Sequence, residues 1–293
     1  MSIEDLSRFN QDLQYHAGPH AVLMLHGLGA SPLELARLAQ EAREEGLSVY
    51  APLIQGYGYG SCPQTWGHWR DQVLRHFRDC QARYETVSVL GVSMGATLAL
   101  MLAEFESPTS VVALAPALAY DGWAIPWVHS LVGLARWIPF SGRYQYVERE
   151  PYGLKNTETR AMIKRLLKSQ HVSEVGSETL ALELILQGRQ LIAQVMSEPE
   201  RIHSPILFMH AVDDESVHVR NPERIYGQVS SKEKEFIYLG DSYHMITIDN
   251  ERDLVRKESL RFIKTAVNRC TRQPAFEMPH FQSYELRRQL QAQ

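Results

Sequence analysis

The hydrophobic residues of this chain fall into two alternating patterns, short apolar runs and longer stretches with helical spacing. Short continuous apolar runs are typical of strands that are buried on both faces of a parallel sheet. We interpret as strands the segments Ala21–Leu25, Leu47–Ala51, Thr86–Leu90, Val111–Leu114, Pro205–Met209 and Glu235–Leu239.

Between these runs, apolar residues recur at spacings of three and four, which predicts amphipathic helices. At the first of them Ser31 can act as the N-cap, Pro32 suits the first turn, and Glu34 would complete a capping box with the serine. Further helices are expected at Thr65–Tyr84 and Ala96–Phe105, from about Pro222, and at Glu251–Val267. This alternation predicts an α/β protein with a mostly parallel central sheet and helices on both faces.

The alternation stops in the middle of the chain. The segment there has two or three helical patterns and no convincing strand, so we interpret it as an insertion into the α/β unit. We therefore expect a core built from residues 1–120 and 203–268, an insertion at residues 121–202, and a mostly polar C-terminal extension at residues 269–293.

The composition excludes several classes of protein. With 44% hydrophobic residues, the chain of 293 residues is too apolar for intrinsic disorder. Its formal net charge of -4 leaves no excess of positive charge to neutralise phosphates, so we expect no nucleic-acid partner. The most apolar of the long stretches, Trp123–Phe140, is interrupted by His129, Arg136 and two prolines, which argues against a membrane-spanning helix.

The cysteines bear on the cellular compartment. Cys62, Cys80 and Cys270 lie far apart and form neither a C-x-x-C pair nor a metal-binding spacing. A sparse, odd number of cysteines is typical of a reducing compartment. The N-terminal segment has neither the basic nor the apolar part of a secretory signal. We therefore expect a cytoplasmic protein without structural disulfides.

A Gly-x-Ser-x-Gly sequence at Gly91, Ser93 and Gly95 is the strongest chemical signal in the chain. It follows an apolar strand and precedes an apolar helix, which is the setting of a nucleophile elbow. Side chains at the two glycines would crowd the strained turn. The serine projects at the N-terminus of a helix, whose dipole favours negative charge. We expect Ser93 to be the catalytic nucleophile; the alternative is a serine that only caps the helix.

The loop after the first strand reaches the same edge of the sheet and contains His26 and Leu28. A loop there can aim a backbone N–H group at the carbonyl oxygen of a substrate bound to Ser93. We expect Leu28 to supply one such donor and Met94, directly after the nucleophile, to supply the other. Since an oxyanion hole uses backbone groups, we expect His26 to be structural.

The base that activates such a serine should lie at this edge as well. The chain contains 12 histidines, so position has to select one. His244 follows the last predicted strand, and catalytic groups in open α/β sheets gather at the carboxyl ends of strands. His210 also ends a strand and is the alternative. A histidine base predicts a rate that rises through a limb at about pH 6–7.

The acid that orients the base should follow the preceding strand, where Asp213, Asp214 and Glu215 stand side by side in the sequence. Three adjacent carboxylates cannot all serve one imidazole. We place Asp214 first, Asp213 second and Glu215 third. The order of Ser93, Asp214 and His244 along the chain is then nucleophile, acid, base, which is the order expected of α/β-hydrolases.

The segments LMLHGLGASP, VLGVSMGATLAL, AVDDESVHVRNPERIY and SYHMITIDNERD resemble the α/β-hydrolases, and more narrowly the bacterial carboxylesterases and monoacylglycerol lipases. Around the acid those relatives share a G-x-x-D-x-x-V pattern, onto which Ala211, Asp214 and Val217 align. The resemblance therefore favours Asp214 over Asp213. One departure is Ala96, where many relatives have a second glycine after the elbow.

The resemblance implies a serine hydrolase that cleaves carboxylic esters through an acyl-enzyme on Ser93, without a metal or an organic cofactor. It also implies that the insertion at residues 121–202 is a helical cap over the active site. The expected substrate is a small ester with an apolar acyl group, and a homo-oligomer is left open. A thioesterase or acyltransferase would use the same triad, and a non-catalytic ligand-binding protein on this scaffold is the remaining alternative.

The insertion leaves the sheet after the nucleophile's helix and returns before the acid's strand, so it must pass over the carboxyl ends of the strands. Apolar side chains at helical spacing in its first half are expected to line the acyl pocket and to favour short to medium acyl chains. They are Trp127, Leu131, Leu134 and Trp137.

Overall fold

The computed structural model describes residues 11–58, 61–125, 145–147, 149–170, 172–173, 176–177, 179–271 and 274–276. Within this part of the chain, a seven-stranded sheet has the order β1-β3-β2-β4-β5-β10-β11. The strands are β1 (Leu13–Tyr15), β2 (His20–Leu25), β3 (Ser48–Ala51), β4 (Thr86–Val92), β5 (Val111–Leu114), β10 (Ile206–Ala211) and β11 (Lys234–Leu239). Neighbouring strands are parallel except β1, which pairs antiparallel with β3. The predicted, mostly parallel sheet is confirmed.

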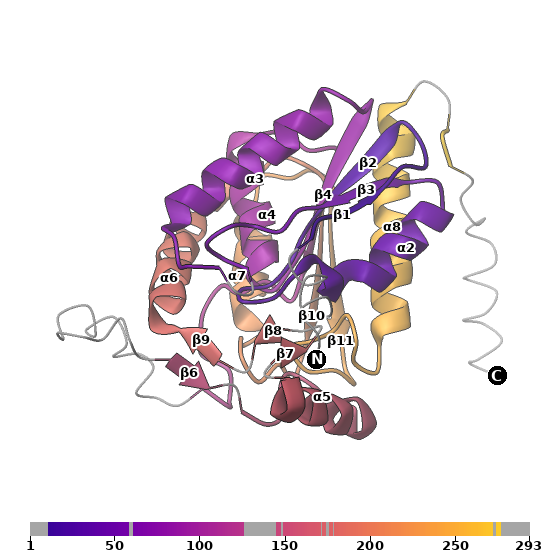
Figure 1. Ribbon diagram of the computed structural model, residues 1–293. Helices are drawn as coiled ribbons and strands as arrows, with labels where there is room; N and C mark the ends of the chain where they lie inside the picture. Colours follow the sequence, from indigo (N-terminus) through magenta and orange to yellow (C-terminus); the bar gives the residue numbers. More distant parts are fainter. Residues whose placement is uncertain are drawn as a thin grey trace, which may run out of the picture.

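Helices cover both faces of this sheet, as predicted (Figure 1). One layer consists of α2 (Ala36–Glu44) and α8 (Arg252–Cys270). The other layer consists of α3 (Trp66–Gln81), α4 (Met94–Phe105), α6 (Leu182–Ser197) and α7 (Arg220–Gln228). Because side chains alternate along a strand, Leu23 and Leu25 of β2 enter the second layer's core, and Val22 and Met24 enter the first layer's core. This double burial explains the continuous apolar runs.

Strand β1 was not predicted. Its three residues are half-buried or exposed, and their sequence, Leu-Gln-Tyr, has no apolar run to mark it. The strand forms because the exposed edge of β3 supplies backbone hydrogen-bonding groups to a segment that has little preference of its own.

The middle of the chain contains short strands, where the sequence predicted none. β6 (Gln145–Val147) pairs antiparallel with β9 (Thr179–Ala181), and β7 (Val172–Ser173) pairs with β8 (Gly176–Ser177). Strands of two or three residues are too short to show an alternating pattern, so the prediction was wrong for a physical reason. Figure 1 places them near α5 (Thr157–Gln170), at one end of the molecule.

Helix α6 lies inside the segment that we expected to be the insertion, and it packs against α4. Helix α6 contributes to the same hydrophobic cluster as α4, through Leu184, Leu191 and Val195.

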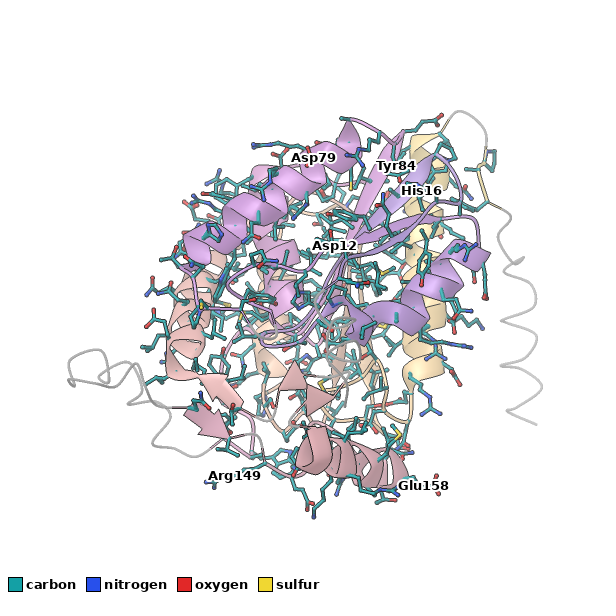
Figure 2. The ribbon with its side chains drawn as sticks, viewed as in Figure 1. Asp12, His16, Asp79, Tyr84, Arg149 and Glu158 are labelled. Atoms are coloured by element: carbon teal, nitrogen blue, oxygen red, sulfur yellow. The ribbon has the colours of Figure 1, made fainter. Side chains whose placement is uncertain are left out.

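In Figure 2, Arg149 and Glu158 mark the end of the molecule that carries α5. No helix of the described residues combines the length and the apolar character needed to cross a membrane.

Candidate active site

Ser93 stands in a strained turn between β4 and α4. Its backbone angles are φ 54° and ψ −121°, a conformation that non-glycine residues rarely adopt. The turn needs both glycines of the motif, because a Cβ atom at Gly91 would lie 2.1 Å from the carbonyl oxygen of Gly95, and one at Gly95 would lie 2.1 Å from that of Leu25. The local sequence thus holds the serine hydroxyl clear of the sheet, at the first turn of α4.

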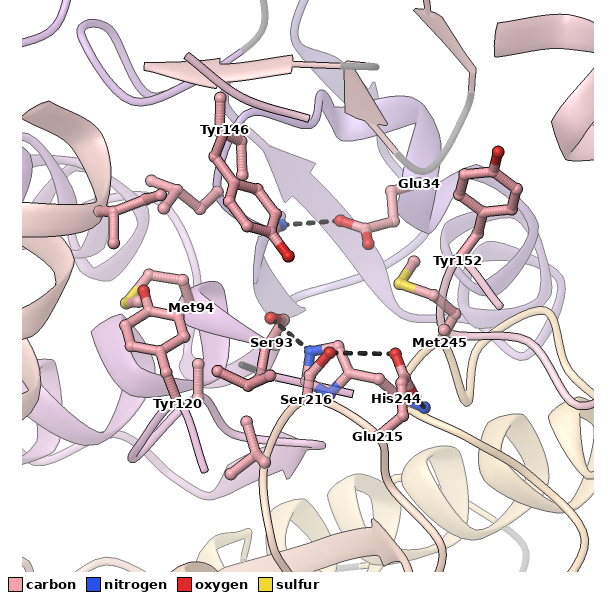
Figure 3. A pocket seen from close by; sticks show the side chains of 18 of the residues that line it. Glu34, Ser93, Met94, Tyr120, Tyr146, Tyr152, Glu215, Ser216, His244 and Met245 are labelled. Carbon is pink, nitrogen blue, oxygen red and sulfur yellow. Dashed lines mark hydrogen bonds between the residues drawn. The ribbon is translucent and has the colours of Figure 1, made fainter. Parts of the chain in front are cut away.

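The structure brings Ser93, His244 and Asp214 together from three separate loops. Figure 3 shows the contact between Ser93 and His244. Oγ of Ser93 and Nε2 of His244 are 2.8 Å apart. On the other side of the imidazole, Nδ1 of His244 donates to Oδ2 of Asp214 at 2.8 Å. The second carboxylate oxygen of Asp214 accepts the backbone N–H groups of Ser216 and Val217, each at 2.8 Å. Four hydrogen bonds therefore fix the serine, the imidazole and the carboxylate relative to one another.

These hydrogen bonds decide the charge of Asp214. Burial would raise the pKa of a carboxyl group that is only 3% exposed. The positive charge and hydrogen bond of His244, together with His210 and the N–H of Val217, outweigh burial and lower the pKa. Asp214 is therefore ionised at neutral pH.

The two carboxylates beside Asp214 do not reach the imidazole. Asp213 is exposed and forms an ion pair with Lys155 at 3.1 Å. Glu215 is buried, and its Oε2 accepts the backbone N–H of His244 at 3.1 Å. Of the three candidates, Asp214 alone is placed against the ring.

The alternative base, His210, lies behind the acid. Its ring is fully buried, with Nε2 2.9 Å from the carbonyl oxygen of Val217 and 3.3 Å from Oδ2 of Asp214. Burial lowers the pKa of His210, so the ring is neutral. In that form it can donate to the groups around Asp214.

His26 braces the loop after β2. Its Nδ1 lies 2.9 Å from the carbonyl oxygen of Gly27, and its Nε2 accepts the backbone N–H of Ile54 at 3.2 Å. Complete burial lowers its pKa to about 4, which keeps the ring neutral and allows Nε2 to accept. The ring thus ties the loop after β2 to the segment after β3.

Leu28 and Met94 line the pocket beside Ser93. Within the described residues, their backbone N–H groups have no hydrogen-bond acceptor. Free N–H groups next to a serine hydroxyl, one of them in the first turn of α4, are suited to bind an oxygen that gains negative charge.

The pocket around Ser93 is lined mainly by apolar and aromatic side chains, several of which the sequence analysis missed. Those outside the predicted set include Glu34, Tyr120, Ile125, Tyr146, Tyr152, Ile163, Leu167, Leu180, Ile185 and Met245. Most lie in the middle segment, where only the folded chain shows which face turns inward. The predicted acyl-pocket residues Trp127, Leu131, Leu134 and Trp137 lie outside the described residues.

Glu34 corrects one local prediction. Ser31 does cap the turn Pro32–Leu35, accepting the N–H of Leu33, but Glu34 does not complete a capping box. Its carboxyl turns into the pocket instead, and Oε2 accepts the backbone N–H of Gly27 at 2.7 Å. A tertiary partner has replaced the local one.

Carboxyl groups around His244 raise its pKa. Burial alone would lower the pKa of the histidine, but the charges of Asp214, Glu215 and Glu34 and the hydrogen bond that its Nδ1 donates to Asp214 raise it to about 9. The alkaline shift changes the expectation from the sequence: the limb that we expected at about pH 6–7 moves to higher pH.

A buried carboxylate that the sequence analysis did not single out fixes the loop of His244. Asp249 is fully buried and accepts the backbone N–H of Tyr243, on the same loop, at 2.8 Å. It also accepts the N–H groups of Lys155 and Asn156, each at 2.8 Å. This carboxylate therefore joins the loop of His244 to the start of α5. Among the described residues, no group of three His, Cys, Asp or Glu side chains is arranged to hold a metal ion.

The chain is similar in sequence to two ester hydrolases. The chain is 29% identical over 257 residues to the thermostable monoacylglycerol lipase of Bacillus sp. (strain H-257), covering 84% of this chain and 90% of that protein. It is 23% identical over 257 residues to the carboxylesterase of Bacillus subtilis (strain 168), covering 85% of this chain and 94% of that protein.

Solved structures share the fold. The monoacylglycerol lipase of Paleococcus ferrophilus superposes with a TM-score of 0.74 at 18% identity, covering 87% of this chain and 98% of that one. The predicted α/β-hydrolase fold is thus confirmed. The sequence pattern of the serine aminopeptidase, S33 family matches residues 18–252, which include the elbow and the loop of His244. The chain therefore belongs to the serine aminopeptidase, S33 family of α/β-hydrolases.

Proposed function

We propose that this protein hydrolyses small carboxylic esters through an acyl-enzyme on Ser93, with His244 as the base and Asp214 as the orienting acid. The observation that carries the proposal is the chain of contacts from Ser93 through His244 to Asp214, which opens into a mainly apolar pocket. The names of the relatives, a monoacylglycerol lipase and a carboxylesterase, support the ester class of substrate.

The chemistry follows from the order of these contacts. Oγ of Ser93 attacks the carbonyl carbon of the ester, while Nε2 of His244 takes the hydroxyl proton. Asp214 holds the imidazole by Nδ1 and stabilises the imidazolium that forms. Nε2 then donates this proton to the leaving alcohol, which departs and leaves the acyl group on the serine. A water molecule, deprotonated by the same nitrogen, then attacks the acyl carbonyl. The bond from the acyl carbon to Oγ breaks, Nε2 returns the proton to Oγ, and the acid is released.

The negative charge that develops on the carbonyl oxygen needs donors. The N–H groups of Leu28 and Met94 supply them, and both are free in the described part of the chain. Donors of this kind are preorganised, because the elbow fixes Met94 and His26 braces the loop of Leu28. Removing one such donor costs other enzymes about 10²–10³ in kcat.

We also propose that residues 121–202 form a cap that sets the size of the substrate. Ile163, Leu167, Leu180 and Ile185 from this segment line the pocket, which supports the proposal.

Rates on a panel of esters test this function. Wild-type protein should hydrolyse p-nitrophenyl esters faster than a matched thioester and faster than an aminoacyl amide. The Ser93→Ala variant should lose activity on all three substrates. A faster thioester would transfer the function to a thioesterase, and acyl transfer to an added alcohol in preference to water would indicate an acyltransferase. A fluorophosphonate probe separates an enzyme from a ligand-binding protein, because only a poised serine reacts with it.

The cytoplasm is the compartment that we propose, on the evidence of three widely spaced cysteines. The thiols of Cys62 and Cys270 are exposed and that of Cys80 is buried. Titration of thiols in the denatured, unreduced protein should find all three, and a count of one would contradict the proposal.

A further inference from the structure

The pocket contains a carboxyl group that the triad does not use. Glu34 is 7% exposed and lines the same pocket as Ser93 and His244. Figure 3 shows its carboxyl directed into the space above Ser93, with a single hydrogen bond to it. That bond comes from the N–H of Gly27 and reaches Oε2.

The second oxygen of this carboxyl lacks a partner. Among the described residues no group donates to Oε1 of Glu34, although a carboxyl group can accept several hydrogen bonds. The carboxyl lines the pocket, so Oε1 can accept a hydrogen bond from a group that enters it. Since Oε1 faces the pocket, the missing donor is best supplied by whatever occupies the pocket.

The position of Glu34 tells which part of an ester it would meet. Figure 3 shows Glu34, Met245 and His244 on one side of Ser93, and Met94 and Tyr120 on the other. The charges of Glu34 and His244 act on each other's pKa, which also places the two groups close together.

The two sides belong to different hydrophobic clusters. Met245 packs with Leu154, Ile163 and Leu167, whereas Met94 belongs to the main core of the sheet. The leaving oxygen of the ester must lie against Nε2 of His244 to receive its proton. The alcohol part of the ester therefore extends toward Glu34, and the acyl part toward Met94.

We propose that Glu34 binds a free hydroxyl group on the leaving alcohol, and thereby selects esters of hydroxylated alcohols over esters of simple alkanols. This inference rests on the proposed ester hydrolysis at Ser93. A hydroxyl suits Oε1 because it can donate to an ionised carboxyl and accept from a protonated one.

A hydroxyl also suits the charge of the site better than a cation does. Burial raises the pKa of Glu34 to about 7, against the hydrogen bond from Gly27 and the charge of His244, which lower it. The carboxyl is thus only partly ionised at neutral pH. A cationic group would lose its hydration water on entering the pocket, and that loss needs compensation by a charged partner. The other carboxyl of the pocket, Glu215, already accepts the backbone N–H of His244.

The test compares two esters that differ only in the hydroxyl groups, glycerol monobutyrate and propyl butyrate. The readout is the ratio of their kcat/KM values. A hydrogen bond to a carboxyl should give the glycerol ester an advantage of about tenfold in the wild-type protein. Glu34→Met removes the carboxyl at similar length, and the ratio should fall to about one. Glu34→Gln keeps an acceptor for Gly27 and should lower the ratio by a smaller factor.

The ratio separates selection from positioning. Loss of the bond to Gly27 would slow both esters equally, because it acts on the loop of Leu28, so an unchanged ratio in both Glu34 variants would overturn the proposal. If Glu34→Met does not fold, an unchanged ratio in Glu34→Gln decides against it. Glu44→Met, an exposed carboxyl of α2, is the matched control and should keep the wild-type ratio.

Two further outcomes are distinguishable. Butyrylcholine has a cationic alcohol with no hydrogen to donate. If the Glu34 variants slow butyrylcholine more than glycerol monobutyrate, the site binds cations and the hydroxyl proposal is wrong. If wild-type protein hydrolyses neither butyrate nor any p-nitrophenyl ester, the proposed function itself fails. If it hydrolyses p-nitrophenyl esters but shows no preference for the glycerol ester, only the inference about Glu34 fails.

Discussion

Two loops at the carboxyl edge of the sheet each place a buried carboxyl group close to His244, and the two groups differ in charge. Asp214, after β10, accepts two backbone N–H groups and the imidazole, and its pKa is lowered. Glu34, after β2, accepts one N–H group, and its pKa is raised to about 7. The exposed fractions are 3% for Asp214 and 7% for Glu34, so burial does not separate them.

Direct contact with His244 separates them instead. The charge and hydrogen bond of His244, with smaller contributions from His210 and the N–H of Val217, keep the buried Asp214 ionised, whereas at Glu34 burial outweighs the hydrogen bond from Gly27 and the charge of His244. Asp214 is therefore suited to a permanent task, the orientation of His244. Glu34 has one oxygen to which no described residue donates, and a charge that can change, and is suited to contact a substrate that comes and goes.

Both carboxyl groups are proposed to act on chemistry at Ser93, so the largest effect should come from Ser93→Ala. We expect kcat to fall by about 10⁴–10⁶, with the fold unchanged by circular dichroism. Mass spectrometry of organophosphate-treated wild-type protein should locate the adduct on Ser93. An adduct on another serine would remove the basis for assigning a role to either carboxyl.

The role of the ionised carboxyl is tested by Asp214→Asn. The amide favours the wrong imidazole tautomer, so kcat should fall by up to about 10⁴. Asp213→Asn is the matched control, because that side chain is exposed and pairs with Lys155, and its effect should stay within about threefold. The opposite ranking of the two variants would move the orienting role to Asp213.

The acyl side of the pocket should respond to chain length rather than to Glu34. Each methylene buried there contributes about 0.8 kcal/mol, so kcat/KM for p-nitrophenyl esters should rise about fourfold per methylene until the pocket is full. Replacing Trp127 or Trp137 by Ala should shift the optimum to longer chains and leave acetyl esters nearly unchanged. An equal change at every length would mean that these residues act on stability or product release.

The smallest effect should be on the pH profile. His244 must be neutral to act as a base, so kcat/KM should rise with pH through a limb well above pH 7, toward the pKa of about 9. Glu34 is ionised at that pH, and its charge raises the pKa of His244. Glu34→Gln should therefore move the limb to lower pH, by less than about one unit. A limb that stays in place would show that the two groups are not coupled.

Much of this site could be read from local sequence. The elbow around Ser93 is set by two glycines that no other residue could replace, and its position between an apolar strand and an apolar helix is visible without a fold. His244 and Asp214 follow from the rule that the carboxyl ends of parallel strands meet at one edge. The residues alone placed Asp214 first among three adjacent carboxylates, and the resemblance to α/β-hydrolases favoured it over Asp213.

The sequence by itself determined the features whose causes lie within a few residues, which are the buried strands, the amphipathic helices and the strained turn. Tertiary structure decided the partners of side chains that have more than one choice. Glu34 could cap its own helix or accept from Gly27, and only the folded loop makes the second contact available. Likewise, α6 joins the core because it meets α4, and β6 finds β9 about thirty residues away. Local sequence patterns carry no information about such long-range contacts, because the contacts contribute free energy only when distant segments are already in place.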